Sequence, residues 1–373
     1  MSARRAVLAG FYPPPFAGEP VHVKQLAQLL REHGIAVEIL NLNRRADPSP
    51  DYRSARGRLT LLWKLFSLPD RASILHLHTN GHSRKSWLMI LVASLAARLR
   101  GTAAVLTLHS GLLPEYVVGF GRTRRALART ILGSFARIVC VNGEIRRAIQ
   151  HLGIDGSHLV IIPAFLGVAR PIELGTADRA VIRRFRPLVV AVAGGEHDPE
   201  QGLAVVLRAV QQVSGLIPGL GAVLMGWQVG PKTRPLIEEL GLADRAVCLG
   251  EVSHDRCLGF LGAGDVVVRS TFADGDAITV REALALGVPV VASDTDFRPA
   301  GVTLFRKGDV SDLAAKLMQV LTTRAPGFPP PAMPHDQPAR DIWGLYSELA
   351  GPGDDAAHRV QPPRRPATEG RPR

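Results

Sequence analysis

Two carboxylates in one segment are the residues best suited to chemistry in this sequence. The segment RSTFADGDAITVREALALGVPVVASD carries Asp274 and Glu282, with seven residues between them. The second carboxylate lies in an Ala- and Leu-rich stretch of helical spacing that ends at Gly287 and Pro289. Such a carboxylate accepts hydrogen bonds from the vicinal hydroxyls of a sugar or ribose, each contributing on the order of 1.5 to 3 kcal/mol. The spacing therefore indicates a site that binds hydroxyl groups.

The start of the same helix is suited to binding a phosphate. If Gly275 and Asp276 form a turn, Ala277 opens the helix and its first amides have no partner within it. Unpaired amides and the helix dipole favour an anion there. The alternative is structural, with Asp274 as an N-terminal cap and Glu282 as a solvated helix residue. The binding hypothesis uses the backbone of Gly275, Asp276, Ala277, Ile278 and Thr279.

Apolar runs alternate with helical patterns along most of the chain. One series begins at residues 6–11, and a second begins with LVVAVAGG at residues 188–195. Strands that alternate with helices predict parallel sheets covered on both faces, whose ligands bind beyond the carboxyl ends of the strands. We therefore expect an α/β protein of two facing Rossmann-like, doubly wound domains, with the active cleft between them.

The length of 373 residues exceeds what one hydrophobic core usually serves. We expect an N-terminal domain at 1–170, a linker at 171–186 and a second domain at 187–321. A Pro-rich connector and a helix follow at 322–350, and the polar, Arg-rich residues 351–373 are expected to be a disordered tail.

The net charge of +12 is unevenly distributed. Residues 1–186 hold 27 Lys and Arg against 11 Asp and Glu, whereas residues 187–350 hold 13 against 19. A basic face of this size attracts phosphates, nucleic acid or an anionic membrane. Because no nucleic-acid motif accompanies the charge, we expect an anionic acceptor or membrane and no nucleic-acid partner.

The carboxylate segment resembles that of the family-4 nucleotide-sugar glycosyltransferases, which have the GT-B fold. Their E-x7-E motif stands in the setting E-G-x-x-x-x-x-x-E-A-x-A-x-G-x-P-V-V-A. Asp replaces the first Glu here, and the resemblance extends over nearly the whole chain. It implies that the second domain holds the donor, the first holds the acceptor, and the C-terminal helix crosses back to the first domain. The matching positions are Asp274, Gly275, Glu282, Ala283, Ala285, Gly287, Pro289, Val290, Val291 and Ala292.

The resemblance also implies roles for single residues. Glu282 would bind the ribose, Asp274 would touch hydroxyls of the transferred sugar, and the Gly275–Thr279 amides would meet the diphosphate or sugar. The motif TLHSG places His109 near the reacting carbon, and VNGEIRRAIQHLGI has Asn142 where the family has Ser. His109, Asp274 and Glu282 are thus the catalytic candidates. Further donor-binding candidates are Gly18, Ser110, Gly195 and Glu196.

The implied activity is a retaining sugar transfer from a nucleotide diphosphate sugar to an acceptor hydroxyl, without a metal or other cofactor. In such enzymes the leaving phosphate takes the acceptor proton. The acceptor would be a glycan or lipid-linked precursor, as in polysaccharide biosynthesis. The protein would be cytoplasmic and peripheral on the inner face of the membrane.

One departure from the family concerns the donor diphosphate. The family's G-R-L-x-x-x-K-G segment reads GEHDPEQG here, so Glu196 and Gln201 replace the Arg and Lys that neutralise the leaving group. The alternative function is therefore a catalytically impaired homologue that acts as a sugar-nucleotide or partner-binding module. A third hypothesis, an epimerase, would use Glu196 and His197 as bases. Candidate replacement cations are Arg269, Arg281 and Arg298.

No metal site is predicted. The sequence Asp274-Gly275-Asp276 is formally a DxD, but it lies at the expected start of a helix. His76 and His78 share one face of an expected strand, and no third ligand is apparent from the sequence. Cys140, Cys248 and Cys257 form no CxxC pair and fit buried, reduced thiols.

The basic run GRTRRALARTILGSFAR allows two interpretations. It is either a solvated charged face over a core stripe of Leu127, Ile131 and Phe135, or a helix that lies on an anionic membrane. The longest apolar run, residues 87–99, falls short of the roughly 20 residues of a membrane span. The N-terminal apolar run is too short for a signal sequence. Expected membrane anchors are Trp63, Phe66, Trp87 and Leu88.

Overall fold

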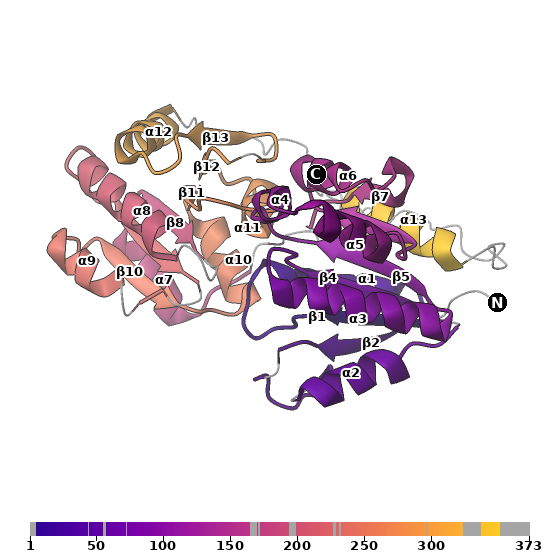
Figure 1. The fold of residues 1–373 in the computed structure, drawn as a ribbon. Helices are drawn as coiled ribbons and strands as arrows, with labels where there is room; N and C mark the ends of the chain where they lie inside the picture. The colour runs from indigo at the N-terminus through magenta and orange to yellow at the C-terminus, as the bar shows by residue number, and fades with distance from the viewer. Residues whose placement is uncertain are drawn as a thin grey trace, which may run out of the picture.

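Two parallel β-sheets, one from each half of the chain, form the frame of this protein (Figure 1). The computed structural model describes residues 5–43, 45–54, 57–71, 73–164, 170, 172–193, 199–226, 229–230, 233–295, 297–323 and 337–350. Within these residues, seven strands form the first sheet and six form the second. The prediction of two Rossmann-like α/β domains is confirmed.

The first sheet has the strand order β3-β2-β1-β4-β5-β6-β7. The chain adds β2 and β3 on one side of β1 and then β4 to β7 on its other side. The strand order therefore reverses between β1 and β4. Ligands of such sheets bind at this switch point, beyond the carboxyl ends. The strands are β1 (Arg5–Gly10), β2 (Ala36–Asn41), β3 (Arg53–Ser54), β4 (Ser73–Thr79), β5 (Ala103–Leu108), β6 (Arg137–Cys140) and β7 (Leu159–Ile161). The helices are α1 (Gly18–Glu32), α2 (Arg58–Ser67), α3 (Arg84–Arg100), α4 (Leu113–Val118), α5 (Arg122–Leu132) and α6 (Gly143–His151), with a 3-10 turn at Gly156–His158.

The second sheet has the order β10-β9-β8-β11-β12-β13 and its own switch point between β8 and β11. The strands are β8 (Leu188–Val192), β9 (Gly221–Met225), β10 (Ala246–Gly250), β11 (Val266–Arg269), β12 (Val290–Ser293) and β13 (Val302–Phe305). The helices are α8 (Pro199–Ser214), α9 (Thr233–Glu239), α10 (His254–Ala263), α11 (Ile278–Ala285) and α12 (Val310–Thr323). Gly287 has a φ of 75°, which lets the chain turn directly from α11 into β12.

The segment expected as a linker, residues 171–186, contains the helix α7 (Thr176–Arg184). Asp178 of this helix accepts two hydrogen bonds from Arg256 of α10, at 2.7 and 2.8 Å. Ile182 and Phe185 are buried in a hydrophobic cluster, and a Cβ at Gly259 of α10 would lie 2.5 Å from Leu174. The segment therefore packs on the second domain. Of the Pro-rich connector expected to follow residue 321, residues 324–336 lie outside the described residues, as does the expected tail at 351–373.

The last described helix, α13 (Gln337–Ala350), returns to the first domain, as predicted. Figure 1 shows it in yellow beside the first sheet. Tyr346 is fully buried there, and its hydroxyl lies 2.9 Å from Nδ1 of His76 on β4. The Trp343 ring packs on His33 at the end of α1, with 4.3 Å between ring centroids. The C-terminal helix therefore packs against β4 and the end of α1 in the first domain.

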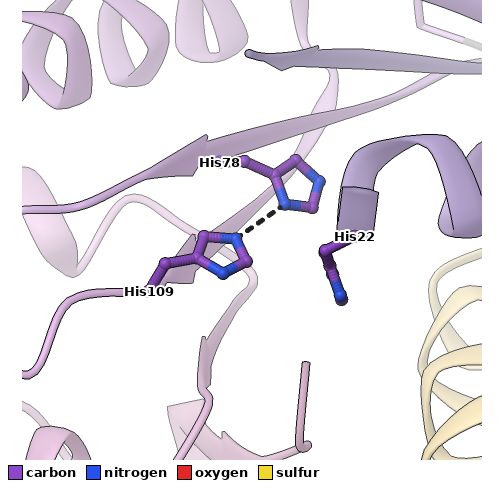
Figure 2. A group of neighbouring side chains, drawn as sticks. All are labelled: His22, His78 and His109. Carbon is purple, nitrogen blue, oxygen red and sulfur yellow. Dashed lines mark hydrogen bonds between the residues drawn. The ribbon is translucent and has the colours of Figure 1, made fainter. Parts of the chain in front are cut away.

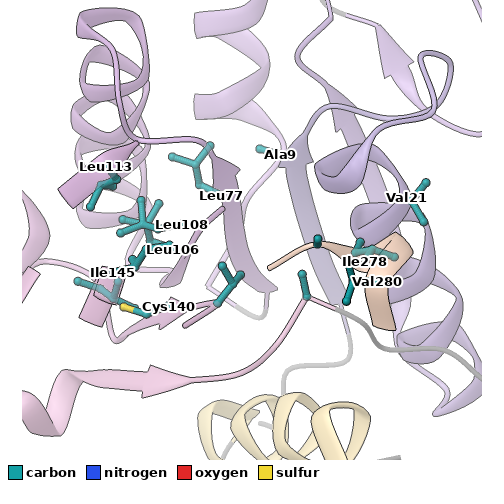
Figure 3. Close-up of a cluster of buried hydrophobic side chains, with 14 of the residues drawn as sticks. Ala9, Val21, Leu77, Leu106, Leu108, Leu113, Cys140, Ile145, Ile278 and Val280 are labelled. Carbon is teal, nitrogen blue, oxygen red and sulfur yellow. The ribbon is translucent and has the colours of Figure 1, made fainter. Parts of the chain in front are cut away.

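An apolar cluster connects the two domains. Ile278 and Val280 at the start of α11 belong to the same buried cluster as Ala9 and Val21 of the first domain. Figure 3 shows the two α11 side chains next to α1. Removing this apolar surface from water stabilises the contact, so the domains face each other in a closed arrangement.

Candidate active site

Two glycine-containing loops meet where the sheets face each other. A Cβ at Gly275 would lie 1.8 Å from the carbonyl oxygen of His109, and one at Gly111 would lie 2.2 Å from that of Asp274. Asn142, which caps α6, donates a hydrogen bond from Nδ2 to the Gly275 carbonyl at 2.5 Å. Only glycine fits at the two contact positions, so the loops after β5 and β11 touch backbone to backbone.

Asp276 forms a second link between the domains. Its Oδ2 accepts a hydrogen bond from the Ala164 amide at 2.8 Å, and Arg281 donates to both carboxylate oxygens. Burial raises the pKa of Asp276, and Arg281 and the Ala164 amide oppose that rise. Asp276 was predicted to bind the donor, but its carboxylate already accepts hydrogen bonds from Ala164 and Arg281.

The helix α11 begins at Ile278 with Ala277 as its N-terminal cap, one residue later than predicted. Ala277 and Ile278 are buried, and Thr279 is half-buried. No side chain caps the start of α11, and the first amides of a helix have no acceptor within it, so amides of this turn can donate to a ligand at the domain interface. The backbone that sequence analysis assigned to phosphate binding thus lies between the domains.

Glu282 is buried on α11, with 1% of its surface exposed. Its Oε1 lies 2.5 Å from Nε2 of His254 on α10, whereas its Oε2 is buried without a hydrogen-bond partner in the described part of the chain. Burial lowers the pKa of His254, but the hydrogen bond and charge of Glu282 outweigh that effect and raise it. His254 therefore fixes one carboxylate oxygen of Glu282 and leaves the other as an acceptor.

Asp274 lies between two arginines instead of facing open space. Arg269 donates to both carboxylate oxygens at 2.8 and 3.0 Å, and Arg298 donates to Oδ2 at 2.6 Å. Thr271 donates to the same oxygen. Although burial opposes ionisation, these cations hold the pKa of Asp274 well below its usual range. The predicted contact of Asp274 with sugar hydroxyls stays a prediction, and the carboxylate already accepts four hydrogen bonds.

The two arginines span the carboxyl edge of the second sheet. Arg269 donates from Nη1 to the carbonyl of Val192 at the end of β8, and Arg298 donates from Nε to the carbonyl of Ser293 at the end of β12. Two arginines share the single charge of Asp274, so the group carries a net positive charge. Arg281, the third arginine named from the sequence, is neutralised by Asp276.

Three imidazoles gather at the carboxyl edge of the first sheet (Figure 2). His78 lies near the end of β4, His109 follows β5 directly, and His22 lies on α1. Nδ1 of His78 is 3.2 Å from Nε2 of His109, and Nδ1 of His22 is 2.6 Å from the Ala164 carbonyl. Burial lowers the pKa of His22 to about 4 and that of the other two rings well below the usual value, so all three are neutral at pH 7.

The remaining site candidates are peripheral or outside the described residues. Gly18 is the exposed first residue of α1, with no atom within 4 Å of a Cβ built there. The Ser110 hydroxyl accepts a hydrogen bond from the Leu112 amide at 3.1 Å. Gly195 and Glu196 lie outside the described residues, as does the side chain of Gln201.

Two residues of the site were not identified from the sequence. His254 contacts Glu282 across 28 positions in the chain, and no spacing signal connects the two. His22 lies among apolar residues of α1, a pattern typical of a core histidine. The only available signal was its place in the second turn of α1, the helix that follows β1.

The comparisons with known proteins agree with this geometry. Residues 17–170 match the family described as Glycosyltransferase Family 4, and residues 186–323 match Glycosyl transferases group 1. The chain is 24% identical over 325 residues to D-inositol 3-phosphate glycosyltransferase of Acidothermus cellulolyticus, covering 74% of this chain and 70% of that one. It is 26% identical over 263 residues to 2-deoxystreptamine N-acetyl-D-glucosaminyltransferase of Streptomyces fradiae, covering 65% and 61%.

Solved structures of low sequence identity share the fold. Anabaena HepE in complex with UDP and glucose superposes with a TM-score of 0.60 at 17% identity, over 92% of this chain and 96% of that one. Sucrose-phosphate synthase from Thermosynechococcus elongatus gives a TM-score of 0.65 at 17% identity, over 93% and 96%. Both comparisons cover the two domains together.

Proposed function

This chain belongs to the family-4 glycosyltransferases of GT-B fold, and we propose that it transfers a sugar from a nucleotide diphosphate donor to an acceptor hydroxyl with retention of anomeric configuration. Transfer from a nucleotide sugar is the family's chemistry. We also propose which residues carry it out, the class of acceptor and the stereochemical course.

The observation that carries the proposal is the group formed by Arg269, Asp274 and Arg298. It lies across the ends of β8, β11 and β12, where an open parallel sheet binds its ligand. A diphosphate gains negative charge as the glycosidic bond breaks, and fixed cations stabilise that charge. We assign the two arginines to the role that Arg and Lys have elsewhere in the family, with Asp274 as the residue that positions them.

The nucleoside end of the donor is assigned to Glu282. Its unpaired Oε2 offers an acceptor to a ribose hydroxyl, and His254 holds the carboxylate in place. The amides of the first turn of α11 lie on the same helix and are the complementary donors for phosphate oxygens. One helix would therefore orient both the ribose and the diphosphate.

His109 is assigned to the sugar side of the reaction. Among the described residues, no carboxylate is hydrogen-bonded to the imidazoles of His22, His78 and His109, so the first domain offers no paired acid and base there. This fits a reaction in which the leaving phosphate accepts the acceptor proton on the same face. The closed interface would exclude water from that step.

The acceptor is proposed to be a lipid-linked or other anionic glycan precursor at the inner face of a membrane. Arg122, Arg124 and Arg129 of α5 are exposed, and Leu127 on the same helix is 56% exposed. The neighbouring helices α2 and α3 expose apolar side chains as well, with Trp63 66% and Leu88 59% exposed. No described helix is long and apolar enough to cross a bilayer.

A substitution at Arg298 tests the diphosphate assignment. In Arg298→Gln, Asp274 keeps its paired contact with Arg269, so the local fold should persist. Losing one charge-assisted contact of about 1.5 to 3 kcal/mol should weaken the affinity for a nucleoside diphosphate roughly 10- to 100-fold, with little change for the nucleoside alone. Calorimetric titration of both ligands measures the difference.

Arg306→Gln is the matched control, because Arg306 lies in the same domain with a 77% exposed side chain. Uridine nucleotides are tested first, since the similar HepE structure contains UDP and glucose. If Arg298→Gln loses affinity for the nucleoside and for the nucleoside diphosphate to the same extent, the assignment of Arg298 to the diphosphate site is wrong.

The competing function is a binding module that holds a nucleotide sugar without turning it over. The ion pairs of Arg269 and Arg281 with carboxylates favour it, because they reduce the charge available to a leaving group. The release of nucleoside diphosphate from the best-binding donor distinguishes a glycosyltransferase from a binding module. It is measured with candidate acceptors and with water alone. Tight binding with no release under any of these conditions would establish the module.

A further inference from the structure

We propose that His22, His78 and His109 form a binding site for a transition-metal cation of the zinc class, and that an ion held there blocks the sugar side of the proposed donor site. The block rests on the proposed function, because it depends on His109 facing the donor sugar. The metal site itself rests only on the arrangement of the three rings.

The geometry of the three rings is close to that of a metal site. One ring nitrogen from each histidine lies within 4.8 Å of one from each of the other two. A tetrahedral zinc ion with bonds of about 2.0 to 2.1 Å to nitrogen requires ligand atoms about 3.4 Å apart. Nδ1 of His78 and Nε2 of His109 already have nearly that spacing, at 3.2 Å. His22 lies beside this pair, and a small inward movement completes the set (Figure 2).

The hydrogen bond of His22 leaves that ring the lone pair a metal requires. Nδ1 of His22 donates to the carbonyl of Ala164, so its Nε2 is the unprotonated nitrogen, buried and without a partner in the described part of the chain. A metal-binding imidazole commonly has this second hydrogen bond, which fixes its tautomer and orientation. Nε2 of His78 is also buried and unpartnered among the described residues, so that ring can present either nitrogen by proton exchange.

The neighbouring His76 shows the contrast. Its Nδ1 lies 2.9 Å from the Tyr346 hydroxyl and its Nε2 lies 2.7 Å from the Thr107 hydroxyl, so both nitrogens are in use. Its ring stacks on His78, with 4.1 Å between centroids, and supports that side chain. His76 is thus a structural residue, and the ligand set is limited to the three rings with a free nitrogen.

The chemical character of the cluster favours a cation over an anion. Burial holds all three pKa values low, so the rings are neutral and carry lone pairs instead of positive charge at pH 7. Imidazole nitrogens suit zinc, copper and nickel better than magnesium or calcium. His109 is partly exposed, which gives an ion a route of entry and leaves a fourth position open to water.

Metal binding is tested directly on the chain without an affinity tag. Titration with Co²⁺, followed by the intense visible bands of a tetrahedral cobalt site and by displacement with Zn²⁺, should give one site per chain. In His22→Ala the affinity should fall by at least roughly 100-fold, because losing a ligand exceeds the 10- to 100-fold effect of an outer hydrogen-bond partner. His109→Gln is the second variant and should show the same loss.

His151→Ala is the matched control, since His151 is exposed at the end of α6 and should leave cobalt binding unchanged. Circular dichroism and thermal unfolding without metal show whether each variant is folded. Absence of a tetrahedral cobalt spectrum in the unaltered chain would overturn the site. Unchanged affinity in folded His22→Ala or His109→Gln would do so as well.

The block is tested separately with the donor. Zinc at a concentration that saturates the site should reduce the affinity for the best-binding nucleotide sugar at least tenfold, and His22→Ala should remove that effect. If metal binds and no nucleotide sugar does, the proposed function fails and the metal site stands. If the donor binds equally well with and without zinc, the block is refuted, whichever way the cobalt titration ends.

Discussion

The carboxyl group of Glu19 is buried near the start of α1, and its burial is only partly compensated. Burial raises its pKa from 4.5 to about 7, and one hydrogen bond from the Phe11 amide only partly opposes this. Its second oxygen, Oε2, is buried without a partner within the described residues. The residue lies one turn before His22, whose pKa moves in the opposite direction.

A pH-dependent change in stability follows from Glu19. A carboxyl whose pKa is raised on folding binds more protons when folded, so its contribution is fully present below pH 4.5 and is lost as pH rises through about 7. The shift corresponds to about 3 kcal/mol in the free energy of unfolding. We expect Glu19→Gln to be stabilised by up to that amount at pH 8 and by little at pH 5.

Urea unfolding of the variant and the unaltered chain at both pH values measures this difference. Glu32→Gln, at the exposed end of the same helix, is the control and should change stability equally little at both. The low pKa of His22 makes both proteins more stable as pH rises from about 4 towards 6.5, and this shared effect cancels in the comparison. A Glu19→Gln difference that does not depend on pH would contradict the explanation.

At this scale the sequence identified residues by type but not their contacts. The spacing singled out Asp274 and Glu282, and the structure puts Asp274 in the loop before α11 and Glu282 on that helix. The arginines around Asp274 come from β11 and from the loop after β12, and the partner of Glu282 comes from α10. Those contacts depend on tertiary packing, so no local pattern could have assigned them.

Among the elements, the loops that carry Gly111 and Gly275 control how the domains meet. A side chain at Gly275 would overlap the His109 carbonyl, and the helix start behind it is held by Ile278 in the apolar interface. Each loop follows directly from a strand of one sheet, so neither can retreat without disturbing that strand end. The closed arrangement therefore depends on two positions without a side chain.

Gly275→Ala should open the interface while leaving both domains folded. We expect a larger radius of gyration in small-angle X-ray scattering, unchanged circular dichroism, and a lower turnover number, because the closed form aligns the reactants. Gly121→Ala is the matched control, since a Cβ there has no atom within 4 Å. Identical scattering curves for Gly275→Ala and the unaltered chain would show that the loops do not hold the domains together.

The elements themselves were largely predictable, because buried parallel strands are short apolar runs and the helices between them have clear spacing. The helix around Glu282 and the basic helix at α5 were both located within a few residues. The helix α7 was not, because it buries Ile182 alone within a polar, Arg-rich stretch. In such a segment the packing against α10 decides the structure, and the sequence pattern carries little of that information.

For the whole molecule, the two domains carry opposite net charges, positive in the first and negative in the second. The exposed arginines of α5 lie on the basic first domain with α2 and α3 nearby, whereas the second domain is acidic overall. Of the four expected membrane anchors, Trp63 and Leu88 are exposed, but Phe66 and Trp87 pack partly against the core. Leu127, expected in the core stripe, is exposed instead, and Ala128 is buried.

Binding to anionic liposomes should therefore depend on α5. We expect the double variant Arg122→Gln/Arg129→Gln to bind phosphatidylserine vesicles more weakly by about 2 kcal/mol at low salt, which is roughly 30-fold in affinity measured by cosedimentation. The same charge change at exposed Arg208 and Arg234 of the second domain is the control and should have little effect. Equal weakening by both pairs would mean that only net charge matters, and no binding by the unaltered chain would refute the membrane proposal.

Binding of a nucleotide sugar tests the proposed donor site of the second domain. Calorimetric titration of the unaltered chain with a panel of nucleotide diphosphate sugars should identify a donor that binds one to one. Glu282→Gln keeps the size of the side chain but removes its charge, and it should lower the affinity for that donor at least tenfold. The control Glu238→Gln, at an exposed position, should leave the affinity unchanged. A chain that binds none of the donors, or binds its best donor equally well after Glu282→Gln, would overturn the proposed donor site.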